Sequence, residues 1–222
     1  KFDETSCCYA YDTVTPTHSA YLFSGASFVS GKFGNAVSFD GSNDYARNAN
    51  CNIIGGCQGY DHYSMSVWVK FDSFPTGTAY EGIANFRYDA DAYLAVNSDG
   101  NPVFGAYFWG TPSGDHKIEA STEMVTGVWY HIAGTWSEDS DKLRIYVNGT
   151  LDGTNTLSGT TAYMRYSQSY NYIGRCYASS TSCSNGYMDG MVDNLAIFNS
   201  ELSSSQIRAC LLYTSDAADE RN

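Results

Sequence analysis

The sequence predicts an all-β protein built as a two-sheet antiparallel sandwich of jelly-roll type. Aromatic side chains make up 15% of the 222 residues, and aromatic and β-branched side chains suit a pleated sheet better than a helix. Short segments alternate apolar and polar residues with a period of two, which is typical of half-buried strands. Turn-forming residues such as Asn97-Ser98-Asp99-Gly100 separate these segments, so about a dozen short strands are expected in one domain.

Three segments carry the clearest strand patterns. Apolar side chains occupy every second position of residues 64–71, SMSVWVKF. Residues 142–149, KLRIYVNG, alternate in the same way and end at Asn148-Gly149, a strong hairpin signal. Residues 127–136, GVWYHIAGTW, are apolar on both faces, which predicts a central strand covered on each side. Shorter runs predict further strands at 82–87, 92–96, 102–109, 170–175 and 187–198.

One short helix is expected near the C-terminal end of the chain. Ser203 precedes Gln206 by three residues in the pattern of a capping box, and Ile207 and Ala209 follow. Residues 211–222, LLYTSDAADERN, show no periodicity. The sequence therefore predicts a sandwich domain over residues 1–210 and an irregular C-terminal tail, which is either natural or a foreign end, over residues 211–222.

The charge of the chain argues against two classes of partner. Twelve Lys and Arg residues against 24 Asp and Glu residues give a net charge of −12, a field that repels nucleic-acid phosphates and anionic lipid headgroups. No stretch approaches the roughly 20 apolar residues that span a bilayer. The chain opens at Lys1 without an apolar leader. We therefore expect a processed or excised soluble segment that neither binds nucleic acid nor inserts into a membrane.

Cysteine spacing indicates disulfides rather than a zinc site. The seven cysteines do not repeat the paired CxxC spacing of zinc ligands. Cys51 with Cys57 and Cys176 with Cys183 each close a short turn-rich loop, and such disulfides form in oxidising compartments. A further bridge is expected from Cys7 or Cys8 to Cys210, and the thiol left over is either free or joined to another chain. This pattern predicts an extracellular protein, secreted or held at a surface.

Four motifs in order carry a resemblance to a known family. They are GKFGNAVSFDGSNDYA, SMSVWVKF, GVWYHIAGTWSEDSDKLRIYVNGTLDG, and YNYIGR followed by GYMDGMVDNLAIFNSELSSSQI. Together they resemble laminin-G-like domains of the concanavalin A-like lectin/glucanase superfamily over roughly residues 9–209. The resemblance implies two curved antiparallel sheets and often a calcium ion at the rim. It leaves the function open, because the same scaffold carries lectins, adhesion modules, non-catalytic attachments to enzymes, hydrolases and lyases.

A calcium site is predicted at the acidic turn after residue 39. Asp40, Asn43 and Asp44 supply oxygens within five residues, and calcium takes six to eight oxygen ligands. The topology implied by the resemblance brings Asp193 close to them. The alternative is that Asp40, Asn43 and Asp44 form an ordinary turn and that Asp193 makes a structural hydrogen bond.

The candidate chemistry is binding rather than catalysis. A glycosidase needs two carboxylates beside the scissile bond, and in the hydrolases of this superfamily these alternate along one strand, a pattern that no strand here carries. No GxSxG elbow supports a serine nucleophile. Trp109 and Tyr166 are the candidate glycan-stacking rings, although core packing is the alternative for each. Asn148-Gly149-Thr150 is the only N-glycosylation sequon.

The sequence therefore predicts a non-catalytic, extracellular binding or adhesion module, calcium-stabilised, that recognises a glycan or an extracellular protein. The alternative is a structural subunit of an extracellular fibre or matrix filament. Self-association through the unpaired cysteine and the C-terminal tail belongs to this alternative.

Overall fold

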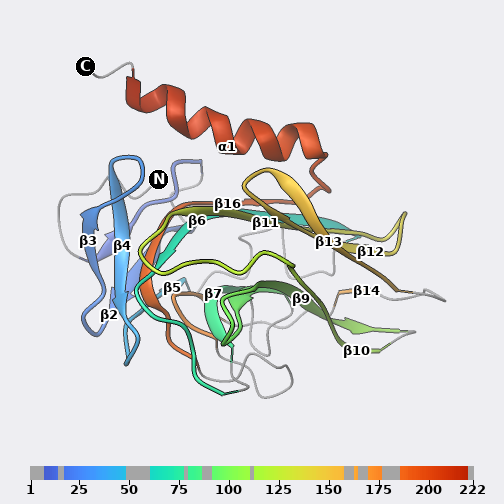
Figure 1. Cartoon of the computed structure of the whole chain (residues 1–222), viewed down its shortest axis with the longest axis horizontal. Helices are drawn as coiled ribbons and strands as arrows, with labels where there is room; N and C mark the ends of the chain where they lie inside the picture. The colour runs from blue at the N-terminus through green and yellow to red at the C-terminus, as the bar shows by residue number, and fades with distance from the viewer. Residues whose placement is uncertain are drawn as a thin grey trace.

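The computed structural model describes residues 8–14, 18–48, 61–77, 80–86, 92–110, 113–157, 163–164, 170–176 and 186–219. In these residues two antiparallel sheets lie one above the other, and a single helix runs across the outside of the upper sheet (Figure 1). The predicted all-β jelly-roll sandwich with one C-terminal helix is confirmed.

Sheet A, the lower sheet of Figure 1, has nine strands among the described residues. Eight of them lie side by side in the order β1 (Tyr9–Ala10), β2 (Ala20–Phe23), β5 (Tyr45–Asn48), β15 (Asn171–Ile173), β7 (Glu81–Phe86), β8 (Ala92–Val96), β9 (Pro102–Trp109) and β10 (Gly114–Glu119). The ninth, β14 (Tyr163–Met164), pairs with the end of β9. The order mixes strands far apart in the sequence, as a jelly roll requires.

Sheet B, the upper sheet, has seven strands in the described chain. Their order is β13 (Thr150–Thr156), β12 (Lys142–Val147), β11 (Tyr130–Ser137), β6 (His62–Phe71), β16 (Asp189–Phe198), β4 (Asn35–Asp40) and β3 (Ser27–Ser30). The segments with the clearest strand patterns, β6, β11 and β12, are neighbours here. Their long alternating runs therefore mark adjacent strands of one sheet.

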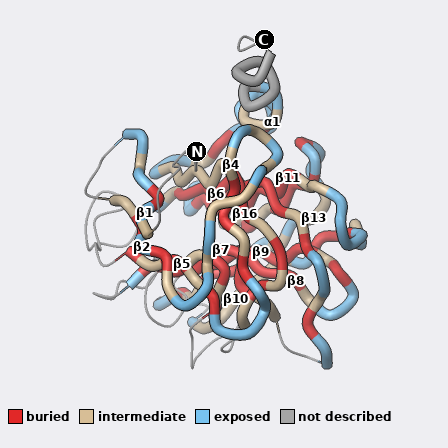
Figure 2. Tube along the Cα trace, turned by 90° about the vertical axis from the view of Figure 1, so that its left-hand side faces the viewer, coloured by how far each residue is buried: buried red, intermediate tan, exposed pale blue. Residues whose placement is uncertain are grey.

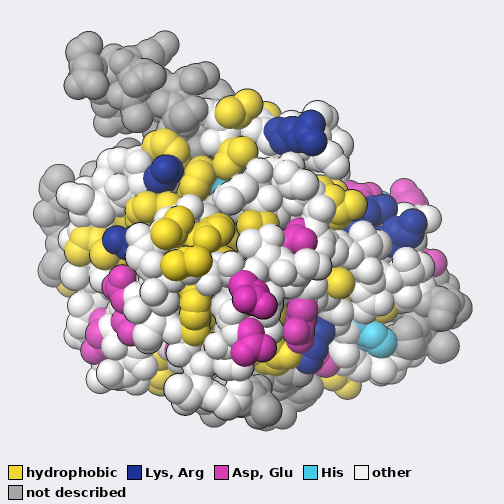
Figure 3. Space-filling view, in the orientation of Figure 1, with side chains coloured by type: hydrophobic (Ala, Val, Ile, Leu, Met, Phe, Trp, Pro, Cys, Tyr) yellow, Lys and Arg dark blue, Asp and Glu magenta, His cyan; other side chains and the backbone are white. Residues whose placement is uncertain are grey.

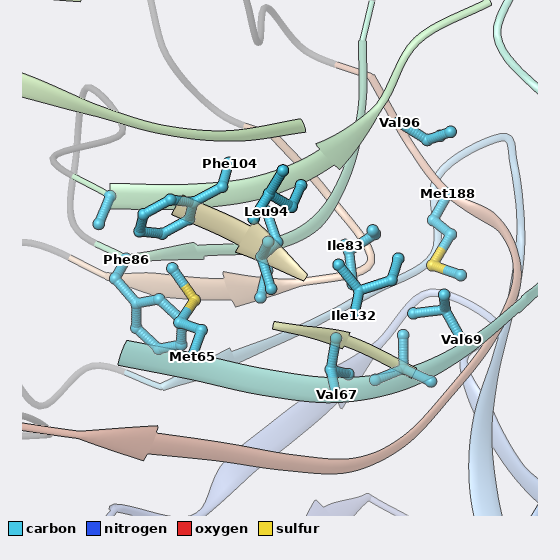
Figure 4. Close-up of a cluster of buried hydrophobic side chains, with 14 of the residues drawn as sticks. Met65, Val67, Val69, Ile83, Phe86, Leu94, Val96, Phe104, Ile132 and Met188 are labelled. Atoms are coloured by element: carbon cyan, nitrogen blue, oxygen red, sulfur yellow. The ribbon is translucent and has the colours of Figure 1, made fainter. Parts of the chain in front are cut away.

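The core fills the space between the sheets (Figure 4). Met65, Val67 and Val69 point inward from β6, as their alternation predicts, and meet side chains such as Ile83 and Leu94 from sheet A. All five are fully buried. Burial of this apolar surface is the main favourable term in folding.

The middle of sheet B is covered on its outer side as well. Leu202 and Ile207, at the start of the helix, pack on Ala133 and Tyr146 of the sheet. The turn between β3 and β4 covers the neighbouring area, where the Phe33 ring lies 5.6 Å from the ring of Trp68. The prediction of a central strand covered on both faces is confirmed for β11.

The Asn148-Gly149 hairpin is also confirmed. It joins β12 to β13, and both residues have positive φ, 49° and 74°. Asn and Gly adopt this left-handed conformation most readily, which is why the pair marks tight hairpins.

The C-terminal helix, α1 (Ser204–Asp219), begins at the predicted capping box. The Ser203 hydroxyl accepts from the Gln206 backbone N–H, and the Gln206 side chain accepts from the Ser203 backbone N–H. α1 projects beyond the strands in Figure 2, and hydrophobic side chains gather beneath it in Figure 3. No helix in the described residues has the length and apolarity needed to cross a bilayer.

The prediction that residues 211–222 are irregular is wrong as far as Asp219, because α1 continues through these residues. Once a capped helix has started, each further residue adds one hydrogen bond at little cost, and Leu and Ala favour elongation. Leu212, in this part of α1, is 60% exposed. Residues 220–222 lie outside the described chain.

Candidate functional site

The outer side of sheet A carries a row of aromatic rings. Strand alternation sends Ala10, Leu22 and Ala46 into the core, so their neighbours face outward. The outward rings are Tyr9, Tyr21, Phe23, Tyr45 and Tyr172, which we call the tyrosine row. Ring centroids are 4.9 Å apart from Tyr9 to Tyr21, from Tyr21 to Phe23 and from Phe23 to Tyr45, and 5.8 Å apart from Tyr45 to Tyr172.

Two arginines lie within this row. The Arg47 guanidinium is 4.6 Å from the Phe23 ring centroid and 4.2 Å from that of Tyr170. The Arg175 guanidinium is 5.3 Å from the ring centroid of Tyr45. All three distances are within the range of cation–π attraction, and a planar guanidinium held on a ring loses less side-chain freedom when it binds a ligand. Positive groups are therefore fixed among the rings of a chain whose net charge is −12.

The half of the same face formed by β8, β9 and β10 carries ordered hydroxyl and carboxylate groups. The Tyr80 hydroxyl donates to Glu119 Oε1 at 2.8 Å, and the Tyr93 hydroxyl donates to Asp115 Oδ1 at 3.1 Å. Burial raises the pKa of both tyrosines above the ordinary tyrosine value. Their hydroxyls therefore stay protonated, and the two carboxylates present acceptors in fixed positions.

Trp109, one of the two predicted glycan-stacking residues, lies at the end of β9 on this outer face. Its neighbour Phe108 points into the core, so alternation turns Trp109 outward, and its side chain is 40% exposed. Tyr166, the other candidate, lies outside the described residues. The tyrosine row was missed by the sequence analysis, and the alternation in AYLF at residues 20–23 was the signal that could have found part of it.

The predicted calcium ligands do not come together as one set. Asp40 Oδ1 accepts from the backbone N–H groups of Ser42 and Asn43, at 2.9 and 3.3 Å, and these bonds hold the pKa of Asp40 below its usual value. Asp44 Oδ1 accepts from the backbone N–H of Gly25 at 2.6 Å. The link between them passes from sheet B to sheet A. Each carboxylate therefore stabilises a different turn.

Asp193 lies apart from the other three residues. Asp189, not Asp193, is the register partner of Asp40, and four further residues along a strand correspond to roughly 13 Å. Asp193 Oδ2 instead accepts from the backbone N–H of Phe33 at 2.9 Å, and burial raises the pKa of its carboxyl. The inclusion of Asp193 in the set is therefore corrected in favour of a structural role.

The fit to calcium is incomplete. After the turn bonds, one carboxylate oxygen each of Asp40 and Asp44 and the amide oxygen of Asn43 remain, against the six to eight oxygens that calcium takes. No group of three or more His, Cys, Asp or Glu suited to a metal occurs among the described residues. Calcium binding at Asp40, Asn43 and Asp44 stays a prediction, and it needs backbone carbonyls or water to complete the shell.

The predicted bridge to Cys210 is wrong. Cys210 is a thiol, half-buried between α1 and sheet B, and it packs against a cluster that includes Ile207. Cys8 precedes β1 at the edge of the other sheet and is itself disulfide-bonded, as is Cys176. Cys7, Cys51, Cys57 and Cys183 lie outside the described residues. The Cys51–Cys57 and Cys176–Cys183 pairings therefore stay predictions.

The sequon asparagine has a hydrogen-bonding role of its own. Asn148 is exposed in the hairpin turn, and its Oδ1 accepts from the backbone N–H of His131 at 3.0 Å. Glycosylation there stays a prediction.

A Ser–His contact on the outer face of sheet B was also missed. Ser66 Oγ lies 2.8 Å from His131 Nε2, and both side chains are buried. Desolvation lowers the pKa of His131 to about 4, so the imidazole is neutral at pH 7. Nδ1 of His131 has no hydrogen-bond partner in the described part of the chain, so these residues supply no carboxylate as the third member of a catalytic triad.

Solved structures with the same fold come from proteins of different kinds. Domain 4 of AbnA, a GH43 extracellular arabinanase from Geobacillus stearothermophilus solved with arabinotriose, is 18% identical, with 85% of this chain and 82% of that chain covered and a TM-score of 0.61. A heptameric SAP-like pentraxin from Limulus polyphemus is 18% identical, with 79% and 81% covered and a TM-score of 0.57.

The binding domain of botulinum neurotoxin DC, solved with rat synaptotagmin II, is 14% identical, with 96% of this chain and 52% of that chain covered and a TM-score of 0.66. At such identities the likeness shows the fold alone. No curated protein matches the chain in sequence. A family model described as the concanavalin A-like lectin/glucanases superfamily matches residues 40–208, which is most of the chain. The chain therefore belongs to the laminin G branch of the concanavalin A-like lectin/glucanases superfamily.

Proposed function

We propose that this protein is an extracellular, non-catalytic binding module that recognises a glycan with the outer face of sheet A. The observation that carries the proposal is the tyrosine row, four rings in contact across β1, β2 and β5 and a fifth on β15, with Arg47 and Arg175 held among them. Tyr9 and Tyr21 are 48% and 37% exposed. Exposed rings beside fixed polar groups are the recognition elements that a sugar needs.

The chemistry of a sugar matches both parts of this face. The C–H side of a pyranose or furanose ring packs on an aromatic ring, while its hydroxyls need donors and acceptors in fixed positions. Arg47 supplies donors beside the tyrosine row, and Glu119 and Asp115 supply acceptors beside Tyr80 and Tyr93. Four adjacent strands span roughly 14 Å at the usual strand spacing, which suits an oligosaccharide better than a monosaccharide.

The test is a glycan array followed by titration calorimetry with the glycan that binds most tightly. Tyr21→Ala removes an exposed ring and is expected to weaken binding by roughly 3- to 10-fold, the range of an aromatic contact. Leu151→Ala is the matched control, because Leu151 is 49% exposed on sheet B and should leave the affinity unchanged. Equal affinity of wild type and Tyr21→Ala for every glycan bound, or no glycan bound at all, would contradict the proposal.

Trp109→Ala tests how far the site extends. Trp109 lies on β9 of the same face, and several strands separate it from β5. A loss of affinity in Trp109→Ala together with Tyr21→Ala indicates one site that spans the sheet, whereas a loss in Tyr21→Ala alone restricts the glycan to the tyrosine row.

The structural-subunit alternative differs in predicting self-association. Cys210, a partly exposed thiol on α1, packs against the cluster that includes Tyr146 of sheet B, and this packing restricts its access to another chain. A monomeric mass by light scattering, with and without reductant, is expected. Release of reducing sugar from a polysaccharide would overturn the non-catalytic part of the proposal.

A further inference from the structure

A cavity lies beside the C-terminal end of β16. It has a volume of about 630 Å³, within the usual range for small-molecule pockets. Its walls come from residues 10–14, from β16 after Asp193, from the outer faces of β6 and β11, from α1 at Ala209 and Cys210, and from sheet A at Ala20, Asn48, Phe86, Asn171 and Ile173. Most of the lining side chains are apolar, among them Leu195, Ile197 and Phe198.

A β-bulge in β16 creates this space. Asp193 pairs with Trp68 of β6, but the next pair is Ala196 with Ser66, so β16 carries one residue more than β6 over this interval. Asn194, within the bulge, has a φ of 48°, a conformation that asparagine tolerates better than most residues. The bulge therefore bends β16 away from β6 and brings Asn194 into the lining of the cavity.

Three of the lining residues each have a side-chain nitrogen that is buried and has no hydrogen-bond partner among the described residues. These nitrogens are Trp68 Nε1, Asn194 Nδ2 and His131 Nδ1. Trp68 is 7% exposed and His131 is 1% exposed. Trp68 Nε1 and Asn194 Nδ2 can only donate. Because a buried donor without an acceptor is costly, a group of them around one cavity indicates a ligand or ordered water that accepts from them.

The charges around the cavity select a neutral ligand. No Lys or Arg occurs among the described lining residues, so a ligand carboxylate would have no counter-ion there. His131 is neutral at pH 7 because desolvation lowers its pKa. Asp12, the one acidic residue among the described lining residues, lies 3.7 Å from His18 and is partly exposed, so that water screens its charge. Apolar walls with neutral donors therefore suit an uncharged molecule with acceptor oxygens.

We propose that this cavity binds an uncharged, largely apolar molecule whose carbonyl or ether oxygens accept hydrogen bonds from Trp68 Nε1 and Asn194 Nδ2. Ser66 and His131 complete the polar end, with Ser66 Oγ between the imidazole and the Cys210 sulfur. The two donors belong to sheet B, and none of the tyrosine-row residues lines the cavity.

The test uses prodan, an uncharged naphthyl ketone whose fluorescence emission shifts to shorter wavelength in an apolar environment. Saturable binding by the full chain is expected, and a naphthyl carboxylate of similar size should bind at least about tenfold more weakly, because its charge would be buried unpaired. Comparable affinity for the ketone and the carboxylate would overturn the assignment of a neutral ligand. Absence of saturable prodan binding would overturn the proposal itself.

Two variants remove one donor each without closing the cavity. Trp68→Phe keeps an aromatic ring but loses Nε1–H, and Asn194→Gly keeps the left-handed backbone but loses the amide. Each is expected to weaken prodan binding about fivefold, the effect of one neutral hydrogen bond. Trp129→Phe is the matched control, because Trp129 does not line the cavity, and it should bind prodan like the wild type. Thermal melts verify folding, and wild-type affinity in both donor variants would show that water, not ligand, satisfies these donors.

Discussion

Acidification should destabilise the protein through His131. The side chain is 1% exposed on β11, and its ring lies 5.5 Å from the ring of Trp68. Desolvation lowers its pKa from 6.5 to about 4, so the native state holds the imidazole neutral while the unfolded chain protonates it near pH 6.5. Between these values the unfolded chain binds more protons. Stability is therefore complete above pH 6.5 and is lost as the pH falls toward 4.

The size of this effect follows from the two pKa values. Each pH unit between them is worth about 1.4 kcal/mol, so the full difference corresponds to about 3 kcal/mol and the loss between pH 7 and pH 4.5 to about 2 kcal/mol. Glu81 acts in the opposite direction over a similar range. Burial raises its pKa from 4.5 to about 7, so its contribution is present at low pH and is lost as the pH rises. Glu81 is partly exposed, and solvent screening makes its contribution smaller.

The assay is urea unfolding at pH 7 and at pH 4.5 for wild type and His131→Gln. Glutamine keeps a hydrogen-bonding side chain but does not titrate, so subtracting the two pH dependences removes Glu81 and every other shared group. The wild type should lose about 2 kcal/mol more than the variant on acidification. His62→Gln, at the start of the neighbouring strand, controls for the loss of a histidine. Parallel pH dependences for wild type and His131→Gln would refute the reasoning.

Three further predictions concern the fold and its rim. Gly134→Ala places a methyl in steric conflict with the Phe104 ring, so it should lower the free energy of unfolding by about 1–3 kcal/mol, measured by urea unfolding; a neutral result would show that the ring moves freely. Asp44→Ala should cost about 1 kcal/mol by losing the bond from Gly25 N–H, while Asp44→Asn, which keeps an acceptor oxygen, should cost less. If calcium binds the turn at Asp40, a hundredfold excess of calcium over Kd raises the free energy of unfolding by about 2.7 kcal/mol, and Asp40→Ala abolishes this increase. A melting temperature that changes with neither chelator nor calcium would show that the turn does not bind calcium.

The fold was predictable because its signals are local. Residues 64–71 and 142–149 each alternate over enough positions to fix both the strand and its buried face, and Asn148-Gly149 fixes the hairpin between neighbours. The helix start was predictable from the Ser203 capping box. The helix beyond residue 210 was not, since elongation there needs no amphipathic pattern.

The candidate site was less predictable because it is assembled across the sheet. β1, β2 and β5 have two to four residues each, too few for a period to emerge, and the tyrosine row draws on residues from Tyr9 to Tyr172. Ser66 and His131 meet only through the register of β6 on β11. Asp193 was misplaced for the same reason, because a shared family topology does not give the register that sets its distance from Asp40.

The two outer faces of the sandwich are used differently because of where the helix lies. The helix of the described residues crosses sheet B, so the outward side chains of β6 and β11 are buried and their polar atoms are enclosed around a cavity (Figure 1). No described helix covers sheet A, and Tyr9 and Tyr21 on its outer side keep exposed surface, whereas Tyr93 and Tyr172 are buried. An exposed aromatic face suits a polar ligand that stays partly in water, whereas a cavity with mostly apolar walls suits a largely apolar ligand. Because none of the tyrosine-row residues lines the cavity, substitutions in the row should add to substitutions of Trp68 or Asn194, and each proposal can fail alone.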